Sequence, residues 1–224
     1  MDYRNEWKHE ISYSDLIAIR QRMKVIAELD EHVNQNGNYK IRSLYFDTLT
    51  DKALREKIDG VNKREKFRIR CYDGNTSIIH LEKKSKWNGM GKKQIANLTK
   101  EETQALIDGD IEWMIKSGRA LVIELYSKMK SEGLRPKTIV EYTREPFVLK
   151  NGNVRVTLDY DIRTGLRGTD FLNPACVMIP AGDPVIILEV KWDEYLPAIV
   201  RSAVQMKGTR SSAFSKYRVC RIYN

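Results

Sequence analysis

Four stretches of the chain repeat apolar residues at the spacing of an amphipathic helix. In the first, Ser14 is the expected N-cap of a helix over 14–32. In the second, Thr99 and Glu102 form a capping-box pattern before an apolar run, which predicts that a helix begins there. The other two predicted helices, which end before Gly133 and Gly208, are 111–131 and Tyr195–Lys207.

Between these helices lie segments rich in β-branched and aromatic residues, which are typical of strands. Asn151–Gly152 separates two of them and is a strong hairpin signal. Strands joined mostly as hairpins indicate the α+β class, with an antiparallel sheet or barrel and helices packed outside. The predicted strands are Ile41–Phe46, Lys66–Tyr72, Ser77–Lys86, Lys92–Leu98, Thr138–Leu149, Val154–Asp161, Val177–Ile179, Val185–Trp192 and Tyr217–Ile222.

Charged residues recur at alternate positions of these strands, so they share one face of the sheet. Arg68 and Arg70 point to one face, while the apolar residues between and beside them point to the other. Glu189 and Lys191 interrupt a strand that is otherwise apolar, as a central strand would be. The further polar positions on these faces are Glu6, Lys8, His80, Glu82, Lys84, Lys86, Tyr142, Arg144, Arg155, Thr157 and Asp159, with Lys216 at the start of the last predicted strand.

These charged faces have two explanations. They are solvent-facing residues that form cross-strand salt bridges, or they line the interior of a closed sheet, where cations repel one another unless a polyanion neutralises them. Bases outnumber acids on the inferred faces, which favours the interior. Arginine and lysine would then bind phosphate oxygens. The carboxylates that would hold a divalent metal on the phosphate chain are Glu6, Glu82, Asp159 and Glu189.

The composition agrees with a polyanionic partner. The 224 residues carry 39 Lys and Arg against 30 Asp and Glu, a formal net charge of +9. The three cysteines form no CxxC pair, the N-terminus has no apolar signal core and no apolar run is long enough for a membrane span. We therefore expect one soluble cytoplasmic domain over residues 1–224.

Six motifs occur in an order that resembles a known family. From about residue 4 to 220 the chain is similar to the catalytic domain of the vacuolar transporter chaperone (VTC) polyphosphate polymerases, within the triphosphate tunnel metalloenzyme (CYTH-like) superfamily. No single motif is very specific for this family, but the six motifs together, in this order, are. They are Tyr45-Phe46-Asp47, Phe67 to Tyr72, Leu81 to Ser85, Tyr142-Thr143-Arg144, Ile187 to Lys191 and Phe214 to Tyr217.

The resemblance implies an eight-stranded antiparallel tunnel and a polymerase that transfers the γ-phosphate of ATP to a growing polyphosphate chain with Mn²⁺ or Mg²⁺. It implies no nucleic-acid partner. The implied catalytic cations are Arg68, Arg70, Lys84, Arg144, Lys191 and Lys216. The implied substrate-binding residues are Lys8, Lys86, Lys93, Tyr142, Arg155 and Ser215. The metal carboxylate carried over by motif is Glu189, and Glu82 and Glu6 are added from the strand pattern.

The first strand departs from the hydrolytic members of the superfamily, which begin with ExExK. Here Lys8 stands where the second acid would be, between Glu6 and Glu10. The exchange removes one metal ligand and adds one phosphate contact, which favours the polymerase branch. Three alternatives remain: a metal-dependent triphosphatase of the same fold, a non-catalytic binder of polyphosphate or nucleic acid, and a degenerate tunnel domain that serves as a structural module.

Overall fold

The computed structural model describes residues 4–88, 90–206 and 214–222. Its strands form an antiparallel sheet in the order β1-β10-β8-β7-β3-β4-β5-β6, and β2 and β9 pair with β7 and β8. The predicted α+β class with an eight-stranded antiparallel path is therefore confirmed. The strands are β1 Asn5–Ile11, β2 Glu28–Leu29, β3 Tyr39–Asp47, β4 Arg64–Tyr72, β5 Asn75–Trp87, β6 Met90–Leu98, β7 Arg135–Leu149, β8 Val154–Thr164, β9 Ile179–Pro180 and β10 Ile186–Trp192.

The chain divides into two compact units, each assembled from separate stretches of sequence. Unit 1 is Met1–Lys40, Tyr142–Ile162 and Asp183–Ser215. Unit 2 is Ile41–Glu141, Arg163–Gly182 and Lys216–Asn224. Neither unit is a continuous piece of chain, so the single domain over 1–224 stays a prediction.

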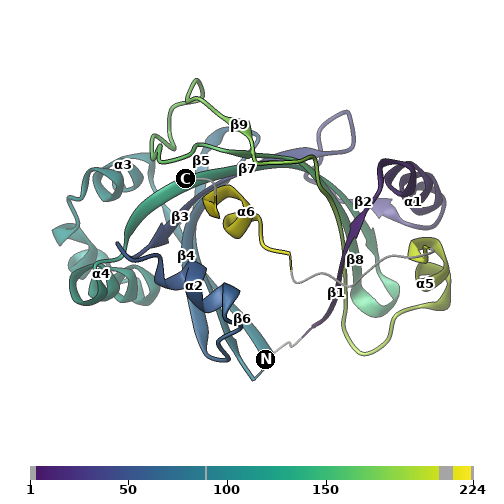
Figure 1. Ribbon diagram of the computed structural model, residues 1–224, viewed down its shortest axis with the longest axis horizontal. Helices are drawn as coiled ribbons and strands as arrows, with labels where there is room; N and C mark the ends of the chain where they lie inside the picture. The colour runs from purple at the N-terminus through teal and green to yellow at the C-terminus, as the bar shows by residue number, and fades with distance from the viewer. Residues whose placement is uncertain (1–3, 89, 207–213, 223–224) are drawn as a thin grey trace. The chain divides into compact units, whose positions relative to one another are not determined.

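In unit 1, two helices cover one face of the strands. α1 (Tyr13–Ile26) and α5 (Ala198–Val204) lie beside each other, as Figure 1 shows in purple and yellow-green. Their apolar residues pack on Val156 of β8 and on Leu188 and Val190 of β10. The residues between these in sequence must point to the opposite face, which is where the charged positions lie.

Unit 2 repeats this arrangement with different helices. α3 (Lys100–Asp108), the 3₁₀ helix η1 (Glu112–Ser117) and α4 (Ala120–Glu132) pack on one face of β3, β4 and β5 (Figure 1). Phe67, Ile69 and Leu81 point into this core. The unit also contains α2 (Lys52–Ile58) and α6 (Lys216–Ile222). The opposite face of the strands is again left to the charged residues.

The helix starts agree with the sequence only in part. Thr99 forms the predicted capping box with Glu102 at the start of α3. The N-cap of α1 is Ser12, not Ser14, because Ser12 bonds Asp15 in a capping box, and the helix ends at Ile26 rather than at residue 32. Local pattern therefore found the helix and misplaced its limits.

Three further expectations need correction. The predicted helix 111–131 is two helices, η1 and α4, separated at Gly118, whose φ of 66° a helix interior does not permit. α5 covers only Ala198–Val204, and Lys207 and Gly208 lie outside the described residues. Tyr217–Ile222 is helix α6 instead of a strand, because Tyr217 and Cys220, three residues apart, are both buried.

The hairpin signal at Asn151–Gly152 is placed correctly. These residues begin a short 3₁₀ turn, η2 (Asn151–Asn153), between β7 and β8, which are neighbours in the sheet. Among the described residues, no helix has the length and apolar character needed to cross a membrane.

Candidate phosphate-binding sites

The residues expected to bind phosphate and metal fall into two groups, one inside each unit. Unit 1 holds Glu6, Lys8, Tyr142, Arg144, Arg155, Glu189, Lys191 and Ser215. Unit 2 holds Arg68, Arg70, Glu82, Lys84, Lys86, Lys93 and Lys216. These groups are the unit 1 site and the unit 2 site.

The centre of the unit 1 site is a carboxylate between two lysines. Glu189 on β10 contacts Lys8 on β1 at 2.8 Å and Lys191 on its own strand at 2.5 Å. Glu6 lies within 3.3 Å of Lys8 and 3.7 Å of Lys191. Burial lowers the pKa of Lys8, but the carboxylates of Glu189 and Glu6 outweigh burial and raise this pKa above its ordinary value. Lys8 is therefore charged at neutral pH.

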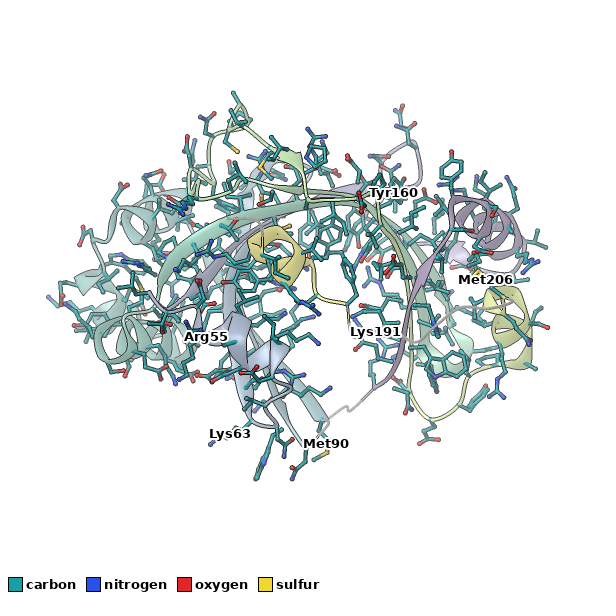
Figure 2. The ribbon with its side chains drawn as sticks, in the orientation of Figure 1. Arg55, Lys63, Met90, Tyr160, Lys191 and Met206 are labelled. Atoms are coloured by element: carbon teal, nitrogen blue, oxygen red, sulfur yellow. The ribbon has the colours of Figure 1, made fainter. Side chains whose placement is uncertain are left out.

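Lys191 shows to which face this group belongs. Figure 2 places its side chain on the side of β10 away from α1 and α5, whose apolar residues contact Val190 and Trp192 instead. The alternation predicted for this strand is present in the structure.

A second ion pair of the unit 1 site joins β7 to β8. Arg144 makes a bidentate contact with Asp159 at 2.6 and 2.7 Å, and its guanidinium lies 5.5 Å from the ring centroid of Tyr142. Burial disfavours the charged guanidinium, yet Asp159 raises the pKa of Arg144 well above its ordinary value. Asp159 is completely buried and serves as the counter-ion of Arg144.

Arg155 and Thr157 complete the polar face of β8. Arg155 donates to the Tyr39 hydroxyl at 2.8 Å and pairs with Asp30 at 2.9 Å. Thr157 is directly opposite Glu189 in the β10–β8 pair, is buried, and its hydroxyl has no hydrogen-bond partner in the described structure. A buried hydroxyl without a partner is costly, so this position has an unused capacity to bind a ligand.

In the unit 2 site, one buried carboxylate on β5 is surrounded by cations from the two neighbouring strands, β4 and β6. Arg68 donates to Glu82 at 2.7 Å through Nε and 2.6 Å through Nη2, and Arg70 lies 3.9 Å away. Lys93 on β6 contacts the other oxygen of Glu82 at 2.5 Å. Burial raises the pKa of Glu82, but the two arginines and Lys93 reverse this and hold the pKa far below its usual range.

Cations continue along β4 and β5 in register. Arg64 is paired with Lys86, and Lys66 with Lys84, two residues further along both strands. Lys84 and Lys86 are exposed, unlike Arg68 and Arg70. Steps of two residues along a strand cover about 6.6–6.8 Å, so these pairs form a row of positive charge on one face.

Lys83 lies between Glu82 and Lys84 in sequence but on the opposite face. It contacts Glu65 at 2.8 Å, pairs with Glu124 on α4, and its ammonium lies 5.5 Å from the ring centroid of Phe67. Lys83 therefore attaches a helix to the sheet and does not belong to the unit 2 site.

Two tyrosines of this site were not predicted to act in it. Tyr45 accepts a hydrogen bond from Arg68 at 2.8 Å and stacks on Tyr217 with ring centroids 4.9 Å apart. Tyr217 follows Lys216 at the start of α6 and donates to Asp47 at 2.6 Å. Both tyrosines belong to quoted motifs, but their contacts join residues far apart in sequence, which alternation does not reveal.

The fold and these charged faces place the chain in the triphosphate tunnel, or CYTH-like, class of α+β proteins. The chain belongs to the VTC domain family, whose model matches residues 3–222. No curated protein matches the sequence.

The chain is similar to several solved structures at low sequence identity. A putative adenylate cyclase from Bacillus halodurans aligns with a TM-score of 0.50 and 13% identity, over 85% of this chain and 80% of that one. A putative adenylate cyclase from Vibrio parahaemolyticus gives 0.44 and 15%, over 90% and 83%. A protein from Pyrococcus horikoshii gives 0.45 and 12%, over 91% and 85%. The first of these likenesses supports the fold alone.

Proposed function

We propose that this protein is a polyphosphate polymerase that transfers the γ-phosphate of ATP to a growing polyphosphate chain. The observation that carries the proposal is the excess of ordered cations on one face of the strands in a member of the VTC domain family. We also propose a cytoplasmic location, which agrees with three free cysteines.

A phosphate-binding site needs basic side chains that are held in place and that outnumber the carboxylates around them. Arg68 and Arg70 are buried and held by Glu82 and by the Ser43 hydroxyl, which is 3.0 Å from Arg70 Nε. Three basic residues, Arg68, Arg70 and Lys93, surround the carboxylate of Glu82. A fourth, Lys66, lies 5.7 Å from the ring centroid of Tyr45. The surplus positive charge would be neutralised by phosphate oxygens.

The carboxylates differ in their fitness to hold a divalent metal. The described residues contain no group of three His, Cys, Asp or Glu side chains that would hold a metal alone. Mg²⁺ commonly takes one or two carboxylates and completes its shell with substrate phosphates and water, a requirement that Glu189 and Glu6 meet together with the Thr157 hydroxyl nearby. We propose Glu189 and Glu6 as the metal carboxylates, and Glu82 as a counter-ion because three cations surround it.

In the proposed reaction, the chain's residues position phosphates and stabilise charge. The γ-phosphoryl transition state is loose and in line, so rigid cations supply most of the catalysis. Arg68, Arg70 and Lys84 would bind the triphosphate of ATP, and Lys8 and Lys191 would lose Glu189 as partner and turn to phosphate. A metal on Glu189 would neutralise charge on the phosphate oxygens. Ser215 and Tyr142 would add hydrogen bonds to phosphate. Further positive charge would come from Lys86, Arg144, Arg155 and Lys216.

The test is incubation of purified protein with ATP and Mn²⁺, followed by gel separation of polyphosphate and assay of free phosphate. Chain growth that stops on addition of a chelator is the expected result. Free phosphate without chains would identify a triphosphatase with the same site. Binding of polyphosphate with neither product would identify a non-catalytic binder, and absence of binding would overturn the proposal.

A further inference from the structure

Tyr45 lies on the charged face of β3, directly opposite Arg68 in the β3–β4 pair. Its hydroxyl accepts a hydrogen bond from Arg68 Nη1 at 2.8 Å, and Glu82 accepts from Nε and Nη2 of the same guanidinium at 2.7 and 2.6 Å. Two groups from neighbouring strands thus hold one arginine from two sides. Because the fork is planar, this fixes the direction in which Arg68 presents its charge.

The ring of Tyr45 connects this arginine to α6. It stacks on Tyr217 with an interplanar angle of 25°, and the Tyr217 hydroxyl donates to Asp47. Asp47 is completely buried and also accepts from the backbone amides of Thr48, Ala53 and Leu54. Tyr45 therefore lies between Arg68 and helix α6, which Tyr217 connects to Asp47.

The charges facing Tyr45 are mainly positive. Lys66 and Arg68 each lie 5.7 Å from the ring centroid. Arg70 follows on the same face of β4, while Glu82 and Asp47 already accept hydrogen bonds. Burial of Tyr45 opposes its ionisation, but Arg68, Lys66 and Arg70 together outweigh burial and lower the pKa of Tyr45 to about 8.

The direction of this shift sets Tyr45 apart from other tyrosines. Burial raises the pKa of Tyr126, Tyr160 and Tyr217, each of which also donates to a carboxylate. Tyr45 instead meets a guanidinium and an ammonium. A tyrosine that accepts from a cation is suited to supply negative charge where no anion is bound.

We propose that Tyr45 is a positioning residue of the unit 2 site, which holds Arg68 in place and, at alkaline pH, takes up a proton when a phosphate chain binds to Arg68 and Arg70. The inference rests on the proposed phosphate binding by this site. No bond to phosphate is made: the phenolate gains one proton from solvent and becomes a phenol. The phosphate then supplies the negative charge that the phenolate supplied before.

The coupling between the proton and the anion is reciprocal. Phosphate oxygens beside Arg68 and Arg70 cancel the field that favours the phenolate, so the pKa of Tyr45 returns towards its ordinary value of about 10. Between the two pKa values, binding requires uptake of a proton. The affinity for phosphate must therefore fall as pH rises, by up to about tenfold per pH unit.

The experiment titrates the full chain with metal-free inorganic tripolyphosphate, from about pH 6.5 to pH 9.5 in steps that bracket the pKa of Tyr45. Affinity is measured by calorimetry, and tyrosinate by its near-ultraviolet absorbance. At pH 8, saturation should remove the absorbance of about half a tyrosinate per chain, and at pH 6.5 almost none. Absorbance reports the tyrosine directly, whereas protons bound by tripolyphosphate do not contribute.

Tyr45→Phe keeps the stacked ring and removes only the hydroxyl. We expect this variant to bind several-fold more weakly at pH 7, to lack the absorbance change, and to lose affinity less steeply above pH 8, so that its curve approaches that of the wild type. A role limited to packing would not change the slope. Tyr13→Phe is the matched control, since Tyr13 is 68% exposed on α1 of unit 1, and it should behave as the wild type.

Each outcome of the tripolyphosphate titration supports or overturns the inference. Binding of tripolyphosphate without loss of tyrosinate absorbance, or with parallel curves for wild type and Tyr45→Phe, would overturn this inference and leave the proposed function intact. Absence of tripolyphosphate binding at every pH would overturn both. If Tyr45→Phe failed to fold, as circular dichroism would show, the wild-type spectrum alone would decide the question.

Discussion

Lys8 and Glu189 are directly opposed across the antiparallel β1–β10 pair, with Lys8 Nζ 2.8 Å from Glu189 Oε2. Lys191 contacts the other oxygen of the same carboxylate at 2.5 Å. In the first strand of hydrolytic relatives an acid is expected where Lys8 stands. Lys8 is therefore a cation that neutralises Glu189 at the place of an expected second carboxylate, and we propose that phosphate replaces Glu189 as its partner.

Glu189→Gln should separate phosphate transfer from phosphate binding. Glutamine keeps the shape but removes the charge proposed to hold metal, so turnover of ATP with Mn²⁺ should fall at least tenfold. Lys8 and Lys191 lose their shared counter-ion, so the affinity for metal-free polyphosphate should stay equal or rise. Glu194→Gln, at an exposed position after β10, is the control. Wild-type turnover in Glu189→Gln would show that the metal assignment is wrong.

Arg70→Ala should weaken nucleotide binding as well as turnover. Loss of hydrogen bonds from a guanidinium to phosphate costs about 1.5–3 kcal/mol each, which corresponds to about 10- to 150-fold in affinity. Calorimetry with ATP measures this directly. Arg201→Ala, exposed on α5, should leave affinity unchanged. Equal affinities of Arg70→Ala and wild type would remove Arg70 from the site.

Adjacent lysines on β5 should behave in opposite ways. Lys84→Gln removes an exposed cation of the row on β4 and β5, so it should reduce tripolyphosphate affinity with little change in melting temperature. Lys83→Gln breaks the contacts to Glu65 and Glu124, so it should lower the free energy of unfolding by about 1–3 kcal/mol and leave affinity unchanged. Thermal unfolding and calorimetry on both variants measure the contrast. The reverse pattern would contradict the assignment of faces.

Tyr217 should make stability sensitive to alkaline pH. Burial and the Asp47 carboxylate raise the pKa of Tyr217 in the folded state. Because its pKa is raised in the folded state, Tyr217 contributes stability that is fully present below the unfolded pKa of about 10. This stability is lost as pH rises above that value. In Tyr217→Phe, unfolding by urea should show a smaller loss of stability between about pH 9.5 and 11 than in the wild type. Equal losses of stability in wild type and Tyr217→Phe would mean that ionisation of Tyr217 does not destabilise the folded protein at alkaline pH.

The sequence was sufficient for features that depend on the period of a strand. Alternation along 67–71 and 186–192 assigned Arg68, Arg70, Glu189 and Lys191 to the face opposite the helices, and the structure confirms that face. Side chains on a strand must alternate whatever the tertiary fold. The identity of their partners follows from pairing between distant strands instead.

Other features depend on contacts that a local pattern does not contain. The aromatic and β-branched residues of Tyr217–Ile222 are typical of a strand, but the segment belongs to helix α6, and its Tyr217 bonds Asp47, 170 residues away in sequence. The role of Tyr45 is equally non-local, because it requires Arg68 from β4 and Tyr217 from α6 together.

The pairing of β1 with β10 also has a consequence for the order in which the protein forms on the ribosome. β4, β5 and β6 follow one another closely, so their hairpins can assemble soon after they leave the exit tunnel. Residues 5–11 must remain without the partner supplied by 186–192 until most of the chain has been translated. We therefore expect nascent chains released before residue 186 to carry an unprotected first strand, and the contact between Lys8 and Glu189 to be among the last that synthesis permits.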